Sequence, residues 1–257
     1  MNGKKTFSEA QAKPEQILAI FQDWQRLELG RSPDDKEILS FQTTVNDWLD
    51  AEDFLDWKSV SKGLNEFFAI NFSKDEWRTV MKPENKKTLL EVCILISSRA
   101  TLPVLNEAKF LGASCKTASA FLALRARLQI AGVDATKLRP SSNLDEFLRL
   151  HTKAMVNATL KLAPGRMPEI KTKSNLVHRF FAWTALASLV VLIGSEICSA
   201  HALTALSCMA LLISFLGLAI CSYLPPAKVQ IVGMETFADL SRLIAGEFEM
   251  RKAQSVL

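Results

Sequence analysis

The sequence predicts an all-α protein in which one or more cytoplasmic helical bundles precede a two-helix transmembrane hairpin. Apolar residues recur at helical spacing through the N-terminal part, and no strand-like alternation persists. Two nearly uncharged stretches, 180–197 and 202–224, are long enough for membrane spans. The predicted parts are an N-terminal helical domain at 1–100, a second helical segment at 101–165, a basic linker at 166–179, the hairpin at 180–224 and a cytoplasmic amphipathic tail at 225–257.

Residues 14–100 are predicted to form a bundle of short helices. Capping boxes, in which Glu follows a Ser or Thr by three residues, open helices at Ser73 and at Thr88. Pro83 ends the helix between them, because proline cannot continue the hydrogen-bond ladder. Residues 100–116 are expected to be a linker. The apolar residues at helical spacing are Ile17, Phe21 and Trp24, then Trp57, Val60, Leu64, Phe67 and Phe68.

The two apolar stretches are expected to span a membrane. A helix rises ~1.5 Å per residue, so roughly 20 apolar residues cross the ~30 Å hydrocarbon layer. Buried core helices of this length would keep a polar stripe, which these stretches almost lack. Only Cys198 to His201 separates the stretches, so the two helices are expected to be antiparallel neighbours.

The charge pattern predicts a multi-pass protein of the inner (cytoplasmic) membrane with both termini in the cytoplasm. The connecting turn has no Lys or Arg, and the positive-inside rule therefore places it outside. Glu196 lies next to this turn, where a snorkelling side chain is favoured over a role in an ion path. The basic residues flanking the hairpin are Arg166, Lys171, Lys173 and Arg179 before it, and Lys228 and Arg242 after it.

The tail is predicted to contain one amphipathic helix. A capping box runs from Thr236 to Asp239, and apolar residues recur around it at helical spacing. The acidic Glu235 and Glu247 oppose contact with an anionic leaflet, so packing on the cytoplasmic domain is favoured over a place on the membrane surface.

The stretch from Asp53 to Ile70, with the helices after it, resembles acyl carrier proteins. In that family an acidic-Ser-Leu motif opens the second helix, and a Ser-capped short helix and a Thr-opened final helix follow. The helix end at Ile70, Ser73 and Thr88 fit those places. Phe54 then stands at the position of the phosphopantetheine-carrying serine, so the resemblance implies the fold without the cofactor.

A second segment, 121–144, resembles the first helix and following loop of the same family. Gly132 follows the helix, and Pro140 precedes a leucine as in the family. An ordinary amphipathic helix ended by Gly132 explains the same residues. The whole arrangement also resembles uncharacterised bacterial two-span membrane proteins, and this resemblance implies no activity.

The sequence offers no signature of catalysis or of a cofactor or metal site. It has no Gly-rich phosphate loop and no G-x-S-x-G, and its five cysteines lack metal-like spacing. The cysteines are expected to be reduced and packed as small hydrophobes. The net charge of +4 is spread out without interleaved aromatics, which argues against nucleic acid as a partner.

An acidic group is the candidate partner-binding site: Asp50, Glu52, Asp53 and Asp56. Acidic residues also favour helix N-termini for structural reasons, and a general acid/base pair is a further alternative. The leading hypothesis is a non-enzymatic, membrane-anchored interaction or scaffold protein, whose partners are the lipid bilayer and another protein. The alternatives are an oligomerising pore-forming or membrane-disrupting effector, and a membrane-bound enzyme or carrier of acyl or lipid metabolism.

Overall fold

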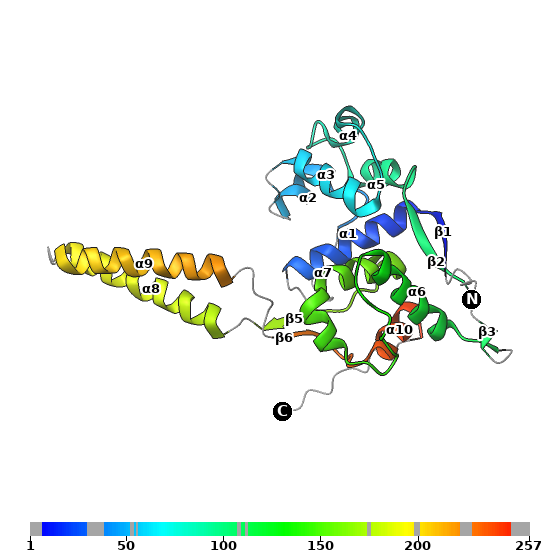
Figure 1. The fold of residues 1–257 in the computed structure, drawn as a ribbon. Helices are drawn as coiled ribbons and strands as arrows, with labels where there is room; N and C mark the ends of the chain where they lie inside the picture. The colour runs from blue at the N-terminus through cyan, green and yellow to red at the C-terminus, as the bar shows by residue number, and fades with distance from the viewer. Residues whose placement is uncertain are drawn as a thin grey trace, which may run out of the picture. The chain divides into compact units, whose positions relative to one another are not determined.

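The computed structural model describes residues 7–29, 39–51, 54, 56–106, 109–110, 113–173, 176–197, 201–221 and 228–247 (Figure 1). These residues form two compact units. The first contains the described residues within 1–144, 151–170 and 231–257, and the second contains those within 145–150 and 171–230.

In the described residues up to Leu105, five helices are framed by two strands. Strand β1 pairs antiparallel with β2, and Phe7 lies opposite Leu105. The pair therefore ties the beginning of this segment to its end. The elements are β1 (Phe7–Gln11), α1 (Pro14–Leu29), α2 (Val45–Ala51), α3 (Trp57–Phe68), α4 (Lys74–Met81), α5 (Leu89–Ser97) and β2 (Thr101–Leu105).

The remaining elements are short strands and helices. Strands β3 and β4 form an antiparallel hairpin, and β5 pairs with β6. The elements are β3 (Lys109–Phe110), β4 (Ala113–Ser114), α6 (Lys116–Ile130), α7 (Leu144–Leu162), β5 (Ile170–Lys173), α8 (Leu176–Ile197), α9 (His201–Cys221), β6 (Lys228–Ile231) and α10 (Phe237–Ala245).

These strands make the all-α prediction wrong. The protein is mostly helical, but it also contains small antiparallel sheets, and β2, β3 and β4 lie in the segment expected to be a linker. The strands are two to five residues long, too short to show alternation along the chain. The partner strands β1 and β2 are also far apart in sequence, so no local pattern announces their pairing.

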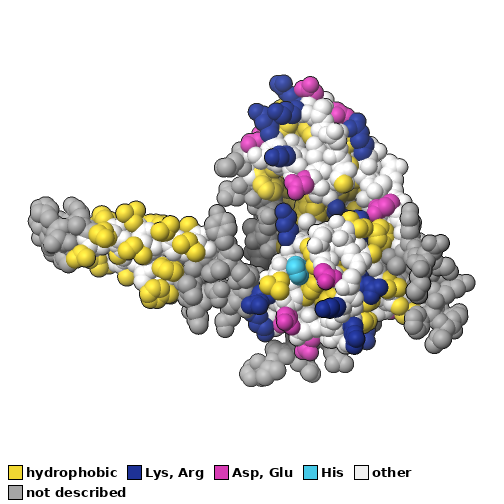
Figure 2. All heavy atoms as spheres, viewed as in Figure 1, with side chains coloured by type: hydrophobic (Ala, Val, Ile, Leu, Met, Phe, Trp, Pro, Cys, Tyr) yellow, Lys and Arg dark blue, Asp and Glu magenta, His cyan; other side chains and the backbone are white. Residues whose placement is uncertain are grey.

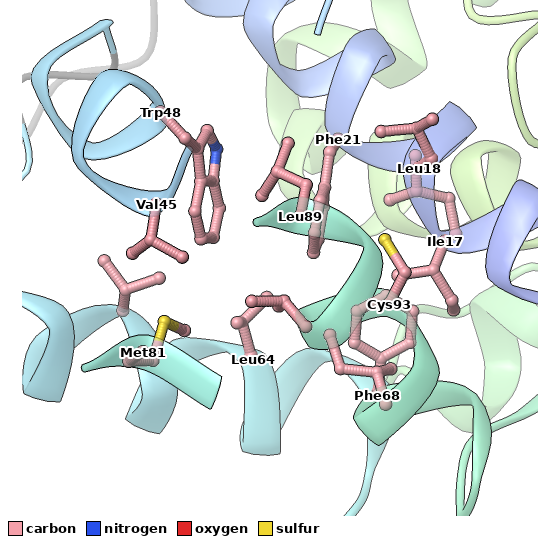
Figure 3. Packing of buried hydrophobic residues seen from close by; sticks show 14 of the residues in the cluster. Ile17, Leu18, Phe21, Val45, Trp48, Leu64, Phe68, Met81, Leu89 and Cys93 are labelled. Carbon is pink, nitrogen blue, oxygen red and sulfur yellow. The ribbon is translucent and has the colours of Figure 1, made fainter. Parts of the chain in front are cut away.

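The core of the first segment forms around α1, which packs against α5. Ile17 and Phe21 are almost fully buried, as their helical spacing predicts. The Phe21 ring stacks on Trp24 and Trp48, with ring centroids 5.7 and 5.0 Å apart. Figure 3 shows Phe21, Trp48 and Leu64 entering this core from α1, α2 and α3. Aromatic stacking thus joins α1 to α2, and Leu64 brings α3 into the same core.

The capping boxes are confirmed where the sequence predicts them. At the start of α4, the Ser73 backbone N–H donates to the Glu76 carboxylate at 2.8 Å, and the Glu76 N–H donates to the Ser73 hydroxyl at 3.2 Å. The Thr88 N–H donates to the Glu91 carboxylate at 3.1 Å before α5. Thr236 caps α10. The tail helix lies where it was expected, and its apolar face packs against α6.

The residues just before α2 and the residues just before α5 are joined by backbone hydrogen bonds. Thr44 forms an isolated antiparallel bridge with Thr88, immediately before these two helices begin. The Val45 N–H donates to the Lys87 carbonyl at 2.8 Å. The two helices therefore start side by side, held by the residues in front of them.

The same arrangement recurs before α7 and α10. Asn143 forms an antiparallel bridge with Thr236, again immediately before two helices begin. The Leu144 N–H donates to the Glu235 carbonyl at 2.9 Å, matching the bond from Val45 to Lys87. This correspondence pairs α2 with the start of α7, and α5 with α10.

The buried positions follow the same correspondence. Leu89, Val92, Cys93 and Ile96 of α5 match Phe237, Leu240, Ser241 and Ile244 of α10. Ile17, Leu18, Ile20 and Phe21 of α1 match Ala120, Phe121, Ala123 and Leu124 of α6. The described chain therefore contains two copies of one helical arrangement, which we call the first copy (α1–α5) and the second copy (α6, α7 and α10).

The two copies differ where the first has α4. Helix α7 has non-helical backbone angles at His151, which divides it into counterparts of α2 and α3. Between the counterparts of α3 and α5, the second copy has β5, α8, α9 and β6 instead of one short helix. The α8–α9 hairpin is thus an insertion into the second copy, and β5 and β6 form its base.

The predictions of transmembrane spans and of an inner-membrane location are wrong. Within the residues that the structure describes, no helix is long and apolar enough to cross a membrane.

The two helices of the hairpin are antiparallel neighbours, as the short connection predicts. The Thr184 and Ser214 hydroxyls lie 3.0 Å apart. A Cβ atom on Gly217 would clash with the Phe181 ring, so the absence of a side chain at Gly217 lets the helices approach there. Apolar side chains such as Trp183 and Leu212 are exposed. Figure 2 shows hydrophobic side chains along the surface of the hairpin. The Glu196 side chain lies outside the described residues.

Candidate functional site

An open pocket with an aromatic lining lies among α1, α2 and α3 of the first copy. Its volume is about 310 Å³. Ser59 contributes its only hydroxyl, and no acidic or basic side chain appears among the described residues that line it. We call this cavity the aromatic pocket; its lining residues are Phe21, Trp24, Trp48, Phe54, Ser59, Val60, Gly63, Leu64 and Phe67.

Packing of the aromatic rings fixes the shape of the pocket. Trp24 meets Phe67 edge to face, with ring centroids 4.5 Å apart, and Trp48 meets Phe54 at 6.2 Å. The Lys161 ammonium lies 4.6 Å from the centroid of the Phe67 ring, and such a cation over an aromatic face holds the ring in place. Burial lowers the pKa of Lys161. Neighbouring side chains therefore hold the aromatic rings of the pocket wall in place.

Gly63 leaves room in the wall formed by α3. A Cβ atom at this position would have no heavy atom within 4 Å. Gly63 lies in the interior of the helix, where glycine is less stable than alanine by roughly 0.5–1 kcal/mol. The glycine therefore lowers helix stability without relieving a clash, and its effect is to keep the pocket open.

The predicted acidic site lies partly beside this pocket. Asp56 is the N-cap of α3, and the Ser59 hydroxyl in the pocket wall donates to its carboxylate at 3.1 Å. The backbone N–H groups of Lys58 and Ser59 hold the pKa of Asp56 below its ordinary value. Asp50 is exposed on α2 and accepts a hydrogen bond from Asn46 at 2.9 Å. Glu52 and Asp53 lie outside the described residues.

The helix start expected from the carrier resemblance is wrong. That resemblance places Phe54 at the opening of a helix, whereas α3 begins at Trp57 and is capped by Asp56. Phe54 precedes the helix, is 39% exposed and lines the pocket. Its ring is therefore a wall of the cavity, and the structure gives the acyl carrier likeness no support.

Two buried ionisable groups lie in the core. Burial and, to a smaller degree, the nearby Glu15 carboxylate raise the pKa of the Cys93 thiol to about 12. Burial also raises the pKa of Asp23 to about 6, against the opposing effect of Arg26. Neither residue lines the aromatic pocket. Across the part of the chain that the structure describes, no cluster of His, Cys, Asp and Glu has the arrangement of a metal site.

No family model, curated protein or solved structure matches this chain. Sequence reasoning missed the aromatic pocket, although it placed Trp24 and Leu64 on apolar helix faces. The available signal was the excess of aromatic residues over 21–67 together with a glycine inside a predicted helix.

Proposed function

We propose that this chain is a non-enzymatic scaffold protein whose aromatic pocket receives an apolar anchor side chain of a partner protein. The observation that carries the proposal is an open, braced aromatic cavity whose described lining bears no charge. Protein interfaces commonly concentrate their binding energy in a few apolar anchors that fill such pockets. Burial of one Leu or Phe side chain contributes roughly 1.5–3 kcal/mol.

The acidic residues beside the pocket indicate the surroundings of that anchor. Asp50 and Asp56 are both exposed, and the pKa of Asp56 is lowered, so it remains ionised near neutral pH. A partner segment with Lys or Arg next to its apolar anchor would meet these carboxylates. Charges at the rim of an interface chiefly affect the rate of association and the choice of partner.

A variant that fills the pocket tests this proposal. Gly63→Leu places an isobutyl group in the open space, whereas Gly63→Ala adds only the Cβ atom, which has no neighbour within 4 Å. Both replace a helical glycine, so neither is expected to reduce stability. Peptides selected from a random library on the wild-type protein should share an apolar residue flanked by Lys or Arg. Their affinity should fall at least tenfold for Gly63→Leu and stay nearly unchanged for Gly63→Ala.

The acidic rim is tested separately by Asp50→Asn combined with Asp56→Asn. Asparagine is an equally good helix cap, so α3 keeps its start while the charge is lost. We expect a severalfold slower association that becomes insensitive to salt. Selected peptides that bind Gly63→Leu as tightly as the wild-type protein would refute the role of the pocket, and an unchanged association rate in the Asn variant would refute that of the rim.

A further inference from the structure

A second groove lies between α3 and α4 of the first copy, with basic residues along it. Its volume is about 900 Å³. The nearly buried Trp57 and the exposed Pro83 supply apolar surface, and Asp75 is the one carboxylate in the described lining. We call it the basic groove; its lining residues are Trp57, Lys58, Lys74, Asp75, Arg78, Thr79, Lys82 and Pro83.

The cations of α4 form a row. Lys74 and Arg78 are four residues apart on the helix, so they share one face, and Lys82 follows directly after the helix ends. The row covers about 12 Å at the rise of an α-helix. Figure 2 shows Lys and Arg side chains gathered over the part of the chain labelled α4 in Figure 1.

Two of these cations have no ion-pair partner in the part of the chain that the structure describes. Among the described residues, neither Lys74 nor Arg78 has an ion-pair partner, whereas Lys82 pairs with Glu84 at 2.7 Å. Lys74 occupies the first position of α4, where the helix dipole disfavours positive charge. Both side chains are exposed. Lys74 and Arg78 are therefore both available to pair with the carboxylates of a ligand, and the position of Lys74 is the one that helix stability does not favour.

The second copy supports the same conclusion. It has the α8–α9 insertion where the first copy has α4, so the shared helical arrangement does not require α4. The basic groove is therefore an added feature of the first copy. Its combination of apolar floor and linear charge matches an amphipathic segment, since carboxylates four residues apart on a helix repeat at the same distance as Lys74 and Arg78.

We propose that the basic groove docks an acidic, amphipathic helical segment of a partner protein. Carboxylates of that segment pair with Lys74, Arg78 and Lys58, and its apolar face lies over Trp57 and Pro83. Asp75 within the groove opposes a uniformly charged phosphate backbone and tolerates a segment whose acidic residues are spaced. The basic groove shares no lining residue with the aromatic pocket, on which the proposed scaffold function rests, although Lys58 lies close to Asp56 at the rim of that pocket.

The test uses the full chain and a labelled synthetic helical peptide with Glu at every fourth position on one face and Leu on the other. Fluorescence anisotropy should show binding that weakens as salt is raised. Lys74→Glu with Arg78→Glu should reduce the affinity by roughly tenfold or more. The matched control is Lys86→Glu with Lys116→Glu, which changes the net charge equally at exposed positions outside the groove and should bind as the wild type does.

Three comparisons distinguish other occupants. A peptide with Gln in place of Glu, a single-stranded oligonucleotide and phosphatidylserine vesicles should each bind more weakly than the acidic peptide, without dependence on Lys74 and Arg78. Lys74→Gln with Arg78→Gln repeats the test without charge reversal, so a folding defect is not mistaken for lost docking. Gly63→Leu should leave this binding unchanged. The proposal fails if the acidic peptide does not bind, binds the Glu variant equally well, or is outcompeted by the vesicles or oligonucleotide in the groove.

Discussion

The buried Asp23 carboxylate of α1 accepts a hydrogen bond from the backbone N–H of Gly165 at 2.7 Å, across 142 residues of sequence. The Met167 N–H also points to this carboxylate, at 3.4 Å, and Arg26 pairs with it from the next turn of α1. Asp23 is fully buried. One acidic side chain of the first copy thus holds the turn that follows α7.

Asp23 predicts that the protein loses stability as the pH rises from about 4 to about 6. Burial raises the pKa of Asp23 from 3.8 to about 6, so the folded state binds a proton that the unfolded state releases over this range. The stabilisation is fully present below pH 3.8 and is lost as the pH passes 6, and its size is on the order of 3 kcal/mol. Urea unfolding at a series of pH values measures it.

The control for this pH dependence is a variant that cannot titrate. Asp23→Asn should lack the slope between pH 4 and 6, although Arg26 loses its partner and overall stability falls by about 1–3 kcal/mol. Asp50→Asn, at an exposed position, should keep the wild-type slope. A wild-type slope in Asp23→Asn would assign the effect to another group.

Replacing Gly165 by alanine is predicted to lower the stability of the protein, and the same replacement at Gly132 provides the comparison. Its φ is +77°, and a Cβ atom there would lie 3.2 Å from the Ala19 Cβ, so Gly165→Ala meets both backbone strain and a close contact. Gly132 has φ +81° but no atom within 4 Å of the added Cβ. Strain alone costs roughly 1–2 kcal/mol, so Gly165→Ala should be destabilised by more than Gly132→Ala in urea unfolding. Equal losses would show that the Ala19 contact yields freely.

Local patterns in the sequence predicted the helices and their caps well. The capping boxes at Ser73, Thr88 and Thr236 lie where predicted, because a cap depends on residues only three positions apart. The strands were missed, since the pairing of β1 with β2 depends on contacts between distant segments. Hydropathy along the hairpin also assigned membrane spans to α8 and α9, whereas no helix within the residues that the structure describes is long and apolar enough to cross a membrane.

The sequence alone did not reveal the duplication or the aromatic pocket, because both depend on how distant segments pack together. The copies share buried positions more than residue types: Ile17 corresponds to Ala120, and Cys93 to Ser241. The resemblance noted at 121–144 fell on α6 and the loop after it, which belong to the second copy. The pocket needs side chains from three helices, and only the folded chain brings Trp24, Trp48 and Phe54 together.

Cys93 and Cys115 are predicted to react with alkylating agents at very different rates. Cys93 is fully buried and its pKa is about 12, so it carries almost no thiolate at pH 8, whereas Cys115 is exposed. Alkylation with iodoacetamide followed by peptide mass spectrometry should label Cys115 within minutes and Cys93 only after unfolding in urea. Early labelling of Cys93 in the native protein would mean that α5 opens readily from the core. Cys93→Ser should lower stability by about 1–3 kcal/mol, because it buries a hydroxyl among apolar side chains.

The insertion predicts that the α8–α9 hairpin is removable. Strands β5 and β6 pair at its base, so a short Gly-Ser turn from Lys173 to Lys228 closes the gap without stretching the chain. Helix α10 should keep its contacts with α6 and its bridge to Asn143, because none of these involves the hairpin. In hydrogen exchange, the α10 amides should be protected in the shortened protein as in the full chain.

A matched deletion of α10 itself should instead expose the buried face of α6 and abolish protection there. Loss of α10 protection on removal of the hairpin alone would show that α8 and α9 are an integral part of the second copy, contrary to their position in place of α4.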